Sequence, residues 1–277
     1  MKELSLREIQ MAEFGVLQKL SELCEKLDLR YYLFYGTLLG AVRHQGFIPW
    51  DDDVDVAMPR PDYEKLLAYC EENAEALKPL YLMHCRTDKR YIYPIARLCD
   101  TRYYVDYENT VDYGLGLFVD IYPLDGCGET EAVAKKIHRK NDILQRLTHL
   151  AGTDKFRPSF TGGIHRTAVK FVSYFYVKLM GARHFALKAD RNSQKLSYDT
   201  DPYVSCTVWF DWYHRFEKAM LDKPAYLTFE GQEFSAPGDY DKLLTDWYGD
   251  YMQLPPEEAR VGHHYYKAYL KDEYENP

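Results

Sequence analysis

The chain has 277 residues, of which 46% are hydrophobic and 28% are charged, proportions that are typical of a soluble globular protein. Its formal net charge of -8 argues against binding to nucleic acid by bulk electrostatics, because proteins that bind in that way carry a basic surface. The six cysteines include no Cys-x-x-Cys pair, and neither an apolar signal core nor a long apolar run occurs. We therefore expect reduced thiols, a cytoplasmic location and no nucleic-acid partner.

The first predicted elements are a helix, a strand and a second helix. A capping-box signature at residues 5–8 precedes apolar residues at helical spacing, which predicts a long first helix. An apolar and aromatic strand over residues 32–35 then ends at Gly36 and Thr37, where the chain turns into a short helix over residues 38–44. We expect the backbone N–H groups and the Thr37 hydroxyl at this turn to point outward and bind an anion such as phosphate.

The next predicted strand carries two carboxylates. Residues 53–56 alternate Asp and Val, so Asp53 and Asp55 lie on the same side of a strand, where they attract a divalent cation. Mg²⁺ held there would lie beside a phosphate held at the preceding turn. Other interpretations stay open. An acidic run over residues 51–53 is also typical of a solvated loop, and the spacing of Asp51, Asp53 and Asp55 matches the start, although not the remainder, of a calcium-binding EF-hand loop.

Helix and strand signals alternate through the middle of the chain. Pro59 and Pro61 predict the start of a helix. Short alternating segments predict strands that continue the same sheet, at residues 80–85, 91–98 and 102–107.

Asp120 lies inside an otherwise apolar predicted strand. A buried carboxylate without a partner costs several kcal/mol, so we expect a positive group beside it. A metal ion would supply that charge, and so would Arg97 or another core partner, and both interpretations stay open. Asp125, next to Gly126, is predicted to form a turn.

The following segment is predicted to be helical and basic. Residues 130–150 predict a helix and residues 152–163 a loop. Residues 157–191 contain seven Lys or Arg and one acidic residue, inside a chain of net charge -8. An interfacial helix that meets an anionic, lipid-linked acceptor has this composition. A helix packed on the domain, with its Lys and Arg side chains reaching solvent, has it too.

The C-terminal part predicts a hairpin over residues 226–234 that turns at Glu230 and Gly231. A helix capped by Asp239 and ending near residue 248 follows.

Residues 36–65 resemble the sequence signature of the LicD family, bacterial enzymes similar to phosphorylcholine transferases of cell-surface glycans. This block joins the Gly-Thr turn, the short helix and the Asp-Val run, and looser likeness continues at residues 118–125 and 248–256. The family is related to the fukutin-type phosphotransferases and to the nucleotidyltransferase-fold superfamily. The resemblance implies an α+β (mixed α/β) fold, a nucleotidyltransferase-like mixed sheet flanked by helices, with helical additions in the C-terminal half. We expect one domain over residues 1–277, with a helical, basic insertion around residues 130–198.

The resemblance also implies a set of site residues. Three carboxylates would surround one or two Mg²⁺ ions, or Mn²⁺ in their place: Asp53, Asp55 and Asp120. Gly36 and Thr37 would bind the donor diphosphate. Further phosphate contacts are expected from Arg43, His44, Arg97, Arg260 and His263. A role as loop anchors stays open for the first two, and the adjacent pair of histidines at 263–264 diverges on any regular element, which argues against a two-His metal site.

The activity that the resemblance implies is phosphoryl transfer from a CDP-linked small alcohol, with CDP-choline as the best-known donor. The acceptor would be a sugar hydroxyl of a cell-envelope glycan precursor, such as a teichoic acid or lipopolysaccharide precursor, with CMP released and Asp120 as the general base. Peripheral contact with the inner membrane surface is part of the same expectation. A nucleotidyltransferase that leaves the nucleotide on its product stays open, as does a non-catalytic glycan- or lipid-binding module. An aromatic box for choline could draw on Trp50, Trp209, Trp212 and Trp247.

Overall fold

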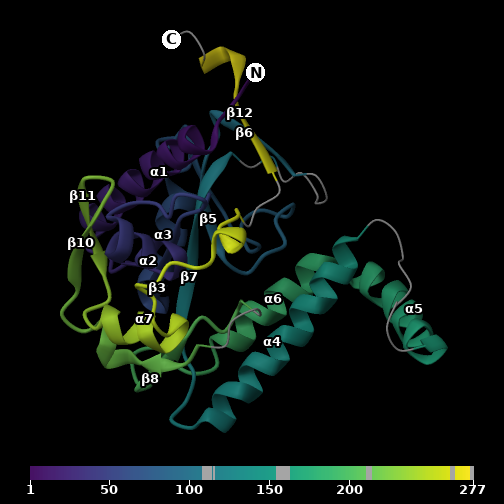
Figure 1. Ribbon diagram of the computed structural model, residues 1–277. Helices are drawn as coiled ribbons and strands as arrows, with labels where there is room; N and C mark the ends of the chain where they lie inside the picture. The colour runs from purple at the N-terminus through teal and green to yellow at the C-terminus, as the bar shows by residue number, and fades with distance from the viewer. Residues whose placement is uncertain (108–113, 115, 154–162, 210–213, 263–265, 275–277) are drawn as a thin grey trace.

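The structure is a computed structural model that describes residues 1–277 except 108–113, 115, 154–162, 210–213, 263–265 and 275–277. Figure 1 shows a body built around a central sheet, with a group of helices that extends away from it to the right. The sheet is mixed and flanked by helices, which confirms the predicted α+β class. All six cysteines have free thiols, as predicted, and all six are buried.

The main sheet has the strand order β2-β3-β7-β5-β4, and β8 and β9 are attached through β7. Its β3–β7 pair is parallel, whereas its other pairs are antiparallel. The strands are β2 (Tyr32–Leu33), β3 (Asp55–Pro59), β4 (Leu80–Met83), β5 (Ala96–Asp100), β7 (Leu117–Gly126), β8 (Tyr203–Ser205) and β9 (Phe216–Glu217). Every residue of β3 and β7 is buried, as expected for the centre of a sheet with both faces covered.

The strand β6 (Tyr103–Tyr107) does not continue the main sheet, so that prediction was wrong. The strand β5 already has β7 on one side and β4 on the other, which leaves no edge at that place for the next strand along the chain. Instead, β6 pairs with β12 (Tyr266–Leu270), which also pairs with β1 (Lys2–Glu3). This second sheet joins the two ends of the chain.

Helices cover the main sheet close to its β2 and β3 side (Figure 1). The first, α1, begins with the predicted capping box, in which Ser5 and Glu8 exchange side-chain and backbone hydrogen bonds. The predicted hairpin turns at Glu230 and Gly231, as expected. The elements are α1 (Leu6–Leu27), α2 (Tyr35–His44), α3 (Arg60–Glu72), α7 (Tyr240–Tyr248), the hairpin strands β10 (Ala225–Phe229) and β11 (Gln232–Ala236), and three short helices, η1 (Lys218–Leu221), η2 (Glu257–Ala259) and η3 (Asp272–Tyr274).

The helical group between β7 and β8 consists of α4 (Glu131–Gly152), α5 (Gly163–Met180) and α6 (Ala182–Ser193). It has an apolar cluster of its own, formed by Leu144, Ala151, Val177, Phe185 and Ala189. The helix α4 confirms the predicted helix over residues 130–150. Most of the predicted loop over residues 152–163 lies outside the described residues. None of the helices in the described part of the chain has the length and apolarity that crossing a bilayer requires.

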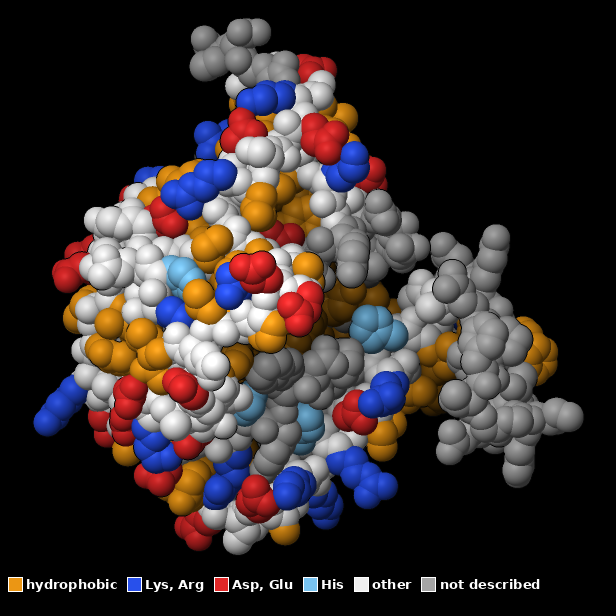
Figure 2. All heavy atoms as spheres, in the orientation of Figure 1, with side chains coloured by type: hydrophobic (Ala, Val, Ile, Leu, Met, Phe, Trp, Pro, Cys, Tyr) orange, Lys and Arg blue, Asp and Glu red, His pale blue; other side chains and the backbone are white. Residues whose placement is uncertain are grey.

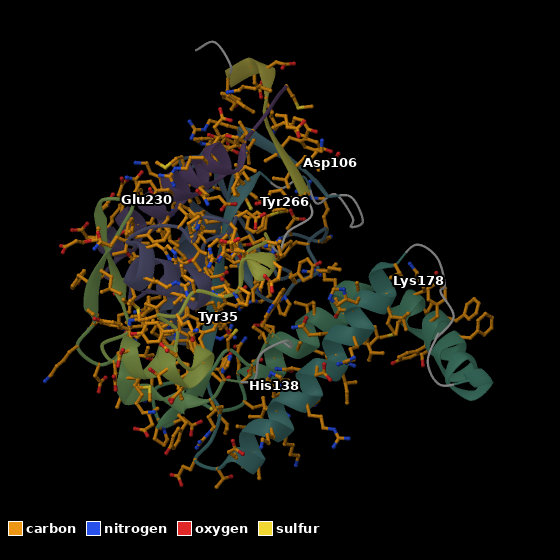
Figure 3. The ribbon with its side chains drawn as sticks, in the orientation of Figure 1. Tyr35, Asp106, His138, Lys178, Glu230 and Tyr266 are labelled. Carbon is orange, nitrogen blue, oxygen red and sulfur yellow. The ribbon has the colours of Figure 1, made fainter. Side chains whose placement is uncertain are left out.

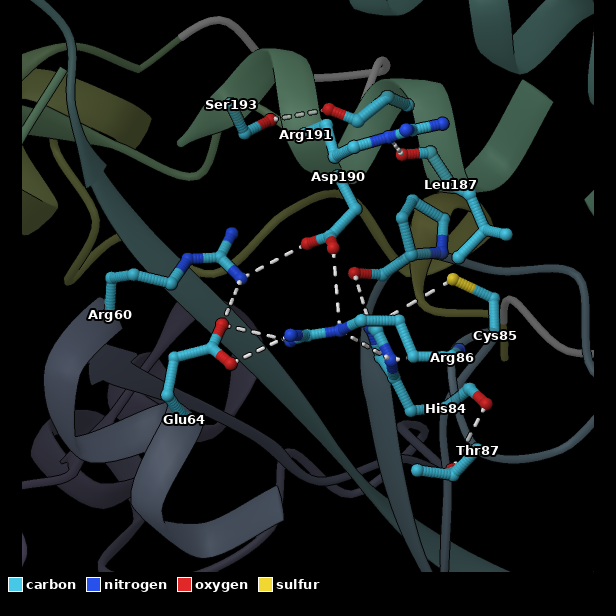
Figure 4. A network of polar contacts seen from close by, with 12 residues as sticks. Arg60, Glu64, His84, Cys85, Arg86, Thr87, Leu187, Asp190, Arg191 and Ser193 are labelled. Carbon is cyan, nitrogen blue, oxygen red and sulfur yellow. Dashed lines mark hydrogen bonds and ion pairs between the residues drawn. The ribbon is translucent and has the colours of Figure 1, made fainter. Parts of the chain in front are cut away.

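A network of charged side chains connects this helical group to the sheet, and its Arg60, Asp125 and Asp190 members are buried. Figure 4 shows the part of it around Asp190. Arg60, the first residue of α3, donates to both Asp125 carboxylate oxygens at 2.7 and 2.6 Å and to Asp190 of α6 at 3.1 Å. Arg86 pairs with Glu64 of α3 at 2.7 Å and with Asp190 at 3.4 Å. Asp125 is therefore a buried residue of β7 with an arginine partner, and the prediction that it forms a turn was wrong.

We expect the substitution Arg60→Met to lower the free energy of unfolding by about 3–5 kcal/mol, because it leaves the buried Asp125 carboxylate without its cation and leaves Asp190 only its longer contact with Arg86. Urea denaturation followed by circular dichroism measures this change. The matched control is Lys242→Met, which breaks an exposed pair with Asp246 and should cost less than about 1 kcal/mol. Equal stability of the two variants would show that the network does not hold the helical group to the sheet.

Candidate active site

A cleft of about 930 Å³ opens above the edge where α2, β3, β7 and β5 meet. This volume is typical of a site for a nucleotide-sized ligand. The opposite wall is formed by Tyr248, the last residue of α7, and by the segment that follows it, which contributes Tyr251 and Gln253 among others. Six of the predicted site residues line the cleft: Gly36, Arg43, Asp53, Asp55, Arg97 and Asp120.

Three of these side chains lie in one row across neighbouring strands. Parallel pairing of β3 with β7 sets Asp55 directly opposite Asp120, and antiparallel pairing of β7 with β5 sets Asp120 opposite Arg97. Residues directly opposite one another across paired strands have their Cβ atoms roughly 4.5–5.5 Å apart, so the three charges are neighbours.

Asp55 is buried among other negative charges. Its side chain is 6% exposed, and burial raises its pKa well above its usual range, with Asp53, Asp120 and Asp51 raising the pKa further. A hydrogen bond from Tyr122 opposes this shift. Its Oδ1 atom has no hydrogen-bond partner. A cation beside this oxygen would satisfy it and favour the charged carboxylate.

Asp120 has the arginine partner that was one of the two open interpretations. Arg97 Nε donates to Asp120 Oδ1 at 2.5 Å and Arg97 Nη2 donates to Oδ2 at 3.1 Å, so the pair is bidentate. The Arg97 guanidinium also lies 4.0 Å from the centre of the Phe118 ring. Arg97 therefore supplies positive charge to Asp120 and fixes the direction of its carboxylate.

The three carboxylates that lie close enough together to share a metal ion are not the predicted set. Among the described residues, Asp51, Asp52 and Asp53 have one oxygen each within 4.8 Å of the others. Asp52 is 7% exposed, so this run is not a fully solvated loop. Asp53 is the residue that this cluster shares with the predicted set.

The start of α2 differs from the predicted turn. The helix begins at Tyr35, one turn earlier than the predicted helix, and Tyr35 takes a positive φ of 43°. The Thr37 hydroxyl does not point outward but accepts a hydrogen bond from the Asp55 N–H at 2.8 Å, which ties α2 to β3. A Cβ on Gly36 would lie 2.8 Å from Asp51 Oδ2, so only glycine lets this carboxylate approach the N-terminus of the helix.

The remaining basic residues lie at the rim. Arg43 Nη1 donates to the Tyr251 carbonyl oxygen at 2.8 Å and so anchors the far wall of the cleft to α2, the role that was left open beside phosphate binding. His44 and Arg260 both contact the Trp50 ring, at 6.3 and 5.7 Å between centres, and Arg260 donates to the Pro255 carbonyl. His263 lies outside the described residues.

Aromatic rings line much of the cleft. Tyr35 packs edge-on against Tyr122 at 5.2 Å, and Tyr122 against Trp209 at 6.0 Å, so a continuous row of rings starts beside Asp55. Trp50 and Trp209 line the cleft, whereas Trp247 packs beneath Tyr35 at 5.3 Å between ring centres. Trp212 lies outside the described residues.

Glu13 on α1 is a carboxylate near the site that sequence analysis did not single out. It is 0% exposed, and burial raises its pKa well above its usual range, with the charges of Asp53 and Asp52 adding to the effect. The Tyr266 hydroxyl lies 3.3 Å from Glu13 Oε1 and 2.9 Å from the Asp52 carbonyl oxygen, so it connects α1 to the acidic loop; Figure 3 shows Tyr266 on β12. Glu13 lies on the buried and mainly apolar face of the helix, and a charged residue at that position is the signal that could have identified it.

The residues present fit a hard divalent cation. The candidate ligands are all carboxylate oxygens, the kind that Mg²⁺ prefers. The buried, unpartnered Oδ1 of Asp55 faces the same group of negative charges, and the nearby Asp53 is only partly buried and lines the cleft. Asp53 and Asp55 could hold such an ion, and Asp120 is paired with Asp55 across the strands and is bound by Arg97.

We expect Glu13→Gln to stabilise the metal-free chain increasingly as the pH rises. A raised pKa in the folded state means that the folded chain binds this proton more tightly than the unfolded chain, so wild-type stability falls as the pH rises above about 4.5. Gln does not titrate, so the variant does not lose stability in this way. Its unfolding midpoint should exceed that of the wild type by roughly 2–4 °C at about pH 8 and by less at about pH 5.

Differential scanning fluorimetry with a chelator present measures both midpoints. The exposed control Glu233→Gln should show no pH-dependent difference from the wild type. A Glu13→Gln variant that is less stable at every pH would mean that the native carboxylate is charged and satisfied.

Comparisons with known proteins point to a family. A model described as "LicD/FKTN/FKRP, nucleotidyltransferase domain" matches residues 28–146, a range that contains every predicted metal ligand. The chain is 29% identical over 273 residues to the lipopolysaccharide cholinephosphotransferase LicD of Haemophilus influenzae, in an alignment that covers 98% of this chain and 100% of that protein. Over 49 residues it is 45% identical to the uncharacterized protein RP689 of Rickettsia prowazekii, which covers 18% of each chain. These findings confirm the resemblance seen in residues 36–65: residues 28–146 match the LicD family model, and the chain is similar over nearly its full length to a LicD protein.

Proposed function

We propose that the chain is a Mg²⁺-dependent transferase that moves a phospho-alcohol, most simply phosphocholine, from a CDP-linked donor to a sugar hydroxyl of a cell-surface glycan precursor. The observation that carries this proposal is the pair Asp55 and Asp120, buried side by side at the floor of the cleft with an unpartnered oxygen on Asp55. The near full-length similarity to a lipopolysaccharide cholinephosphotransferase supports the choice of group and acceptor.

The residues of the cleft have separate roles in the proposed reaction. Asp53 and Asp55 would hold the cation, which when bound neutralises charge on the donor phosphates. The first N–H groups of α2, next to Gly36, face the same space and favour a phosphate oxygen. An incoming diphosphate would have to compete there with the Asp51 carboxylate, which lies against Gly36.

Asp120 is the proposed general base. The acceptor hydroxyl oxygen forms a bond to the phosphorus that bears the small alcohol, its proton passes to Asp120, and the bond to CMP breaks so that CMP leaves. The bidentate contact with Arg97 holds the Asp120 carboxylate in one direction, and Arg97 then stabilises the developing charge of the reacting phosphate nearby.

The row of rings formed by Tyr35, Tyr122 and Trp209 suits a quaternary ammonium headgroup. Such a cation makes no hydrogen bonds, and aromatic faces attract it by about 0.5–2 kcal/mol per contact. Because Tyr122, the middle ring of the row, hydrogen-bonds Asp55, a headgroup on these rings would leave its phosphate near the carboxylates.

We expect Asp53→Asn to reduce CMP release from CDP-choline by at least about a hundredfold, because it removes one charge from the proposed cation site. Chromatography of labelled donor, with purified glycan acceptor and Mg²⁺, measures the product. The exposed control Asp106→Asn on β6 should keep wild-type turnover.

Circular dichroism should show that both variants are folded. Wild-type turnover in the folded Asp53→Asn variant would contradict the cation site, and a product that retains the nucleotide would identify a nucleotidyltransferase instead. Binding of glycan with no turnover of any CDP-alcohol would indicate a binding module.

A further inference from the structure

The helix α5 lies at the far end of the helical group, away from the sheet and the cleft (Figure 1). Its inner face packs against α4 and α6 through Val177, which is 0% exposed and belongs to the apolar cluster of this group. Within α5, the structure describes the side chains of residues 171 and 173–180, which include those on the outer face of the helix.

The outer face carries a row of large hydrophobic side chains. Phe171, Phe175 and Leu179 follow one another at four-residue spacing, so they share one side of the helix. They are 48%, 59% and 85% exposed, and Leu179 is the most exposed large hydrophobic side chain in the described part of the chain. Tyr176 and Met180 widen the row, at 53% and 36% exposed, and Figure 2 shows hydrophobic side chains at the outer edge of this helix. A contiguous apolar face of this kind on a surface marks a contact site.

The sequence around this row is basic although the whole chain is acidic. Residues 163–191 contain six Lys or Arg and a single acidic residue, Asp190. Asp190 is buried and pairs with Arg60 and Arg86, so it does not offset the surface cations. Lys178, labelled on this helix in Figure 3, is exposed, as are Lys188 and Arg191 on α6.

We propose that the outer face of α5 docks onto an anionic lipid surface, with Phe171, Phe175 and Leu179 inserted at the boundary between headgroups and acyl chains. Aromatic and aliphatic side chains on one face, flanked by Lys and Arg, are what such a boundary binds. A second copy of the chain fits less well, because it would bring two basic segments together. The evidence for lipid binding comes from α5 alone. The role of this binding, which is to bring the cleft to a lipid-linked acceptor, rests on the proposed function.

Vesicle flotation tests the proposal with the full chain and no substrate. Vesicles of phosphatidylcholine with roughly 30% phosphatidylglycerol should bind the wild type, and pure phosphatidylcholine should bind it at least about tenfold more weakly. The double variant Phe175→Ser/Leu179→Ser should lose roughly tenfold or more of the binding to anionic vesicles, since two exposed apolar side chains no longer insert. Raising the salt concentration should weaken wild-type binding further.

The control Met11→Ser/Tyr226→Ser removes two exposed hydrophobic side chains elsewhere and should bind like the wild type. Equal loss in this control, equal binding to both kinds of vesicle, or no binding at all would overturn the proposal. A wild type that elutes as a dimer, and becomes monomeric in Phe175→Ser/Leu179→Ser, would overturn it in favour of self-association. Because CMP release from the soluble donor is assayed separately, loss of lipid binding with intact turnover leaves the proposed function standing.

Discussion

Parallel pairing between β3 and β7 is the constraint on which the whole site depends. It sets Asp55 beside Asp120 at one end of the two strands. At the other end, Arg60, which directly follows β3, forms a buried ion pair with Asp125 of β7. The pairing brings negative charges together in a buried place, which is why burial and its neighbours raise the pKa of Asp55 so far. Arg97 contacts Asp120 and not Asp55, so one of the two buried carboxylates has no positive partner from Arg97. This excess of negative charge suits the binding of a cation.

Features that depend on neighbours in sequence were predictable. The Ser5–Glu8 capping box, the hairpin turn at Glu230 and the alternation of Asp and Val near Asp55 are local patterns with local causes. The structure has the corresponding helix and hairpin, and it has a strand that begins at Asp55, so that Asp53 precedes the strand instead of lying within it. The site carboxylates could be proposed for the same reason, because strand period alone puts Asp53 and Asp55 on one side.

Features that depend on distant partners were not predictable from one sequence. Nothing near β6 in the sequence indicates that its partner is β12, more than 150 residues later, and nothing near Asp125 indicates Arg60. Glu13 is a further case, since its importance comes from an acidic loop that only tertiary packing brings to α1. The opposite wall of the cleft also comes from the far end of the chain, through the contact between Arg43 and the Tyr251 carbonyl.

The central claim is that a cation held by Asp53 and Asp55 lies against the donor phosphates, and pulsed electron paramagnetic resonance tests it most directly. With Mn²⁺ in place of Mg²⁺ and CDP-choline bound, the account predicts a ³¹P hyperfine coupling of the size that direct phosphate coordination gives, lost in an Asp55→Asn variant that stays folded. Donor that binds with no such coupling, or a coupling that persists without the Asp55 carboxylate, would contradict it.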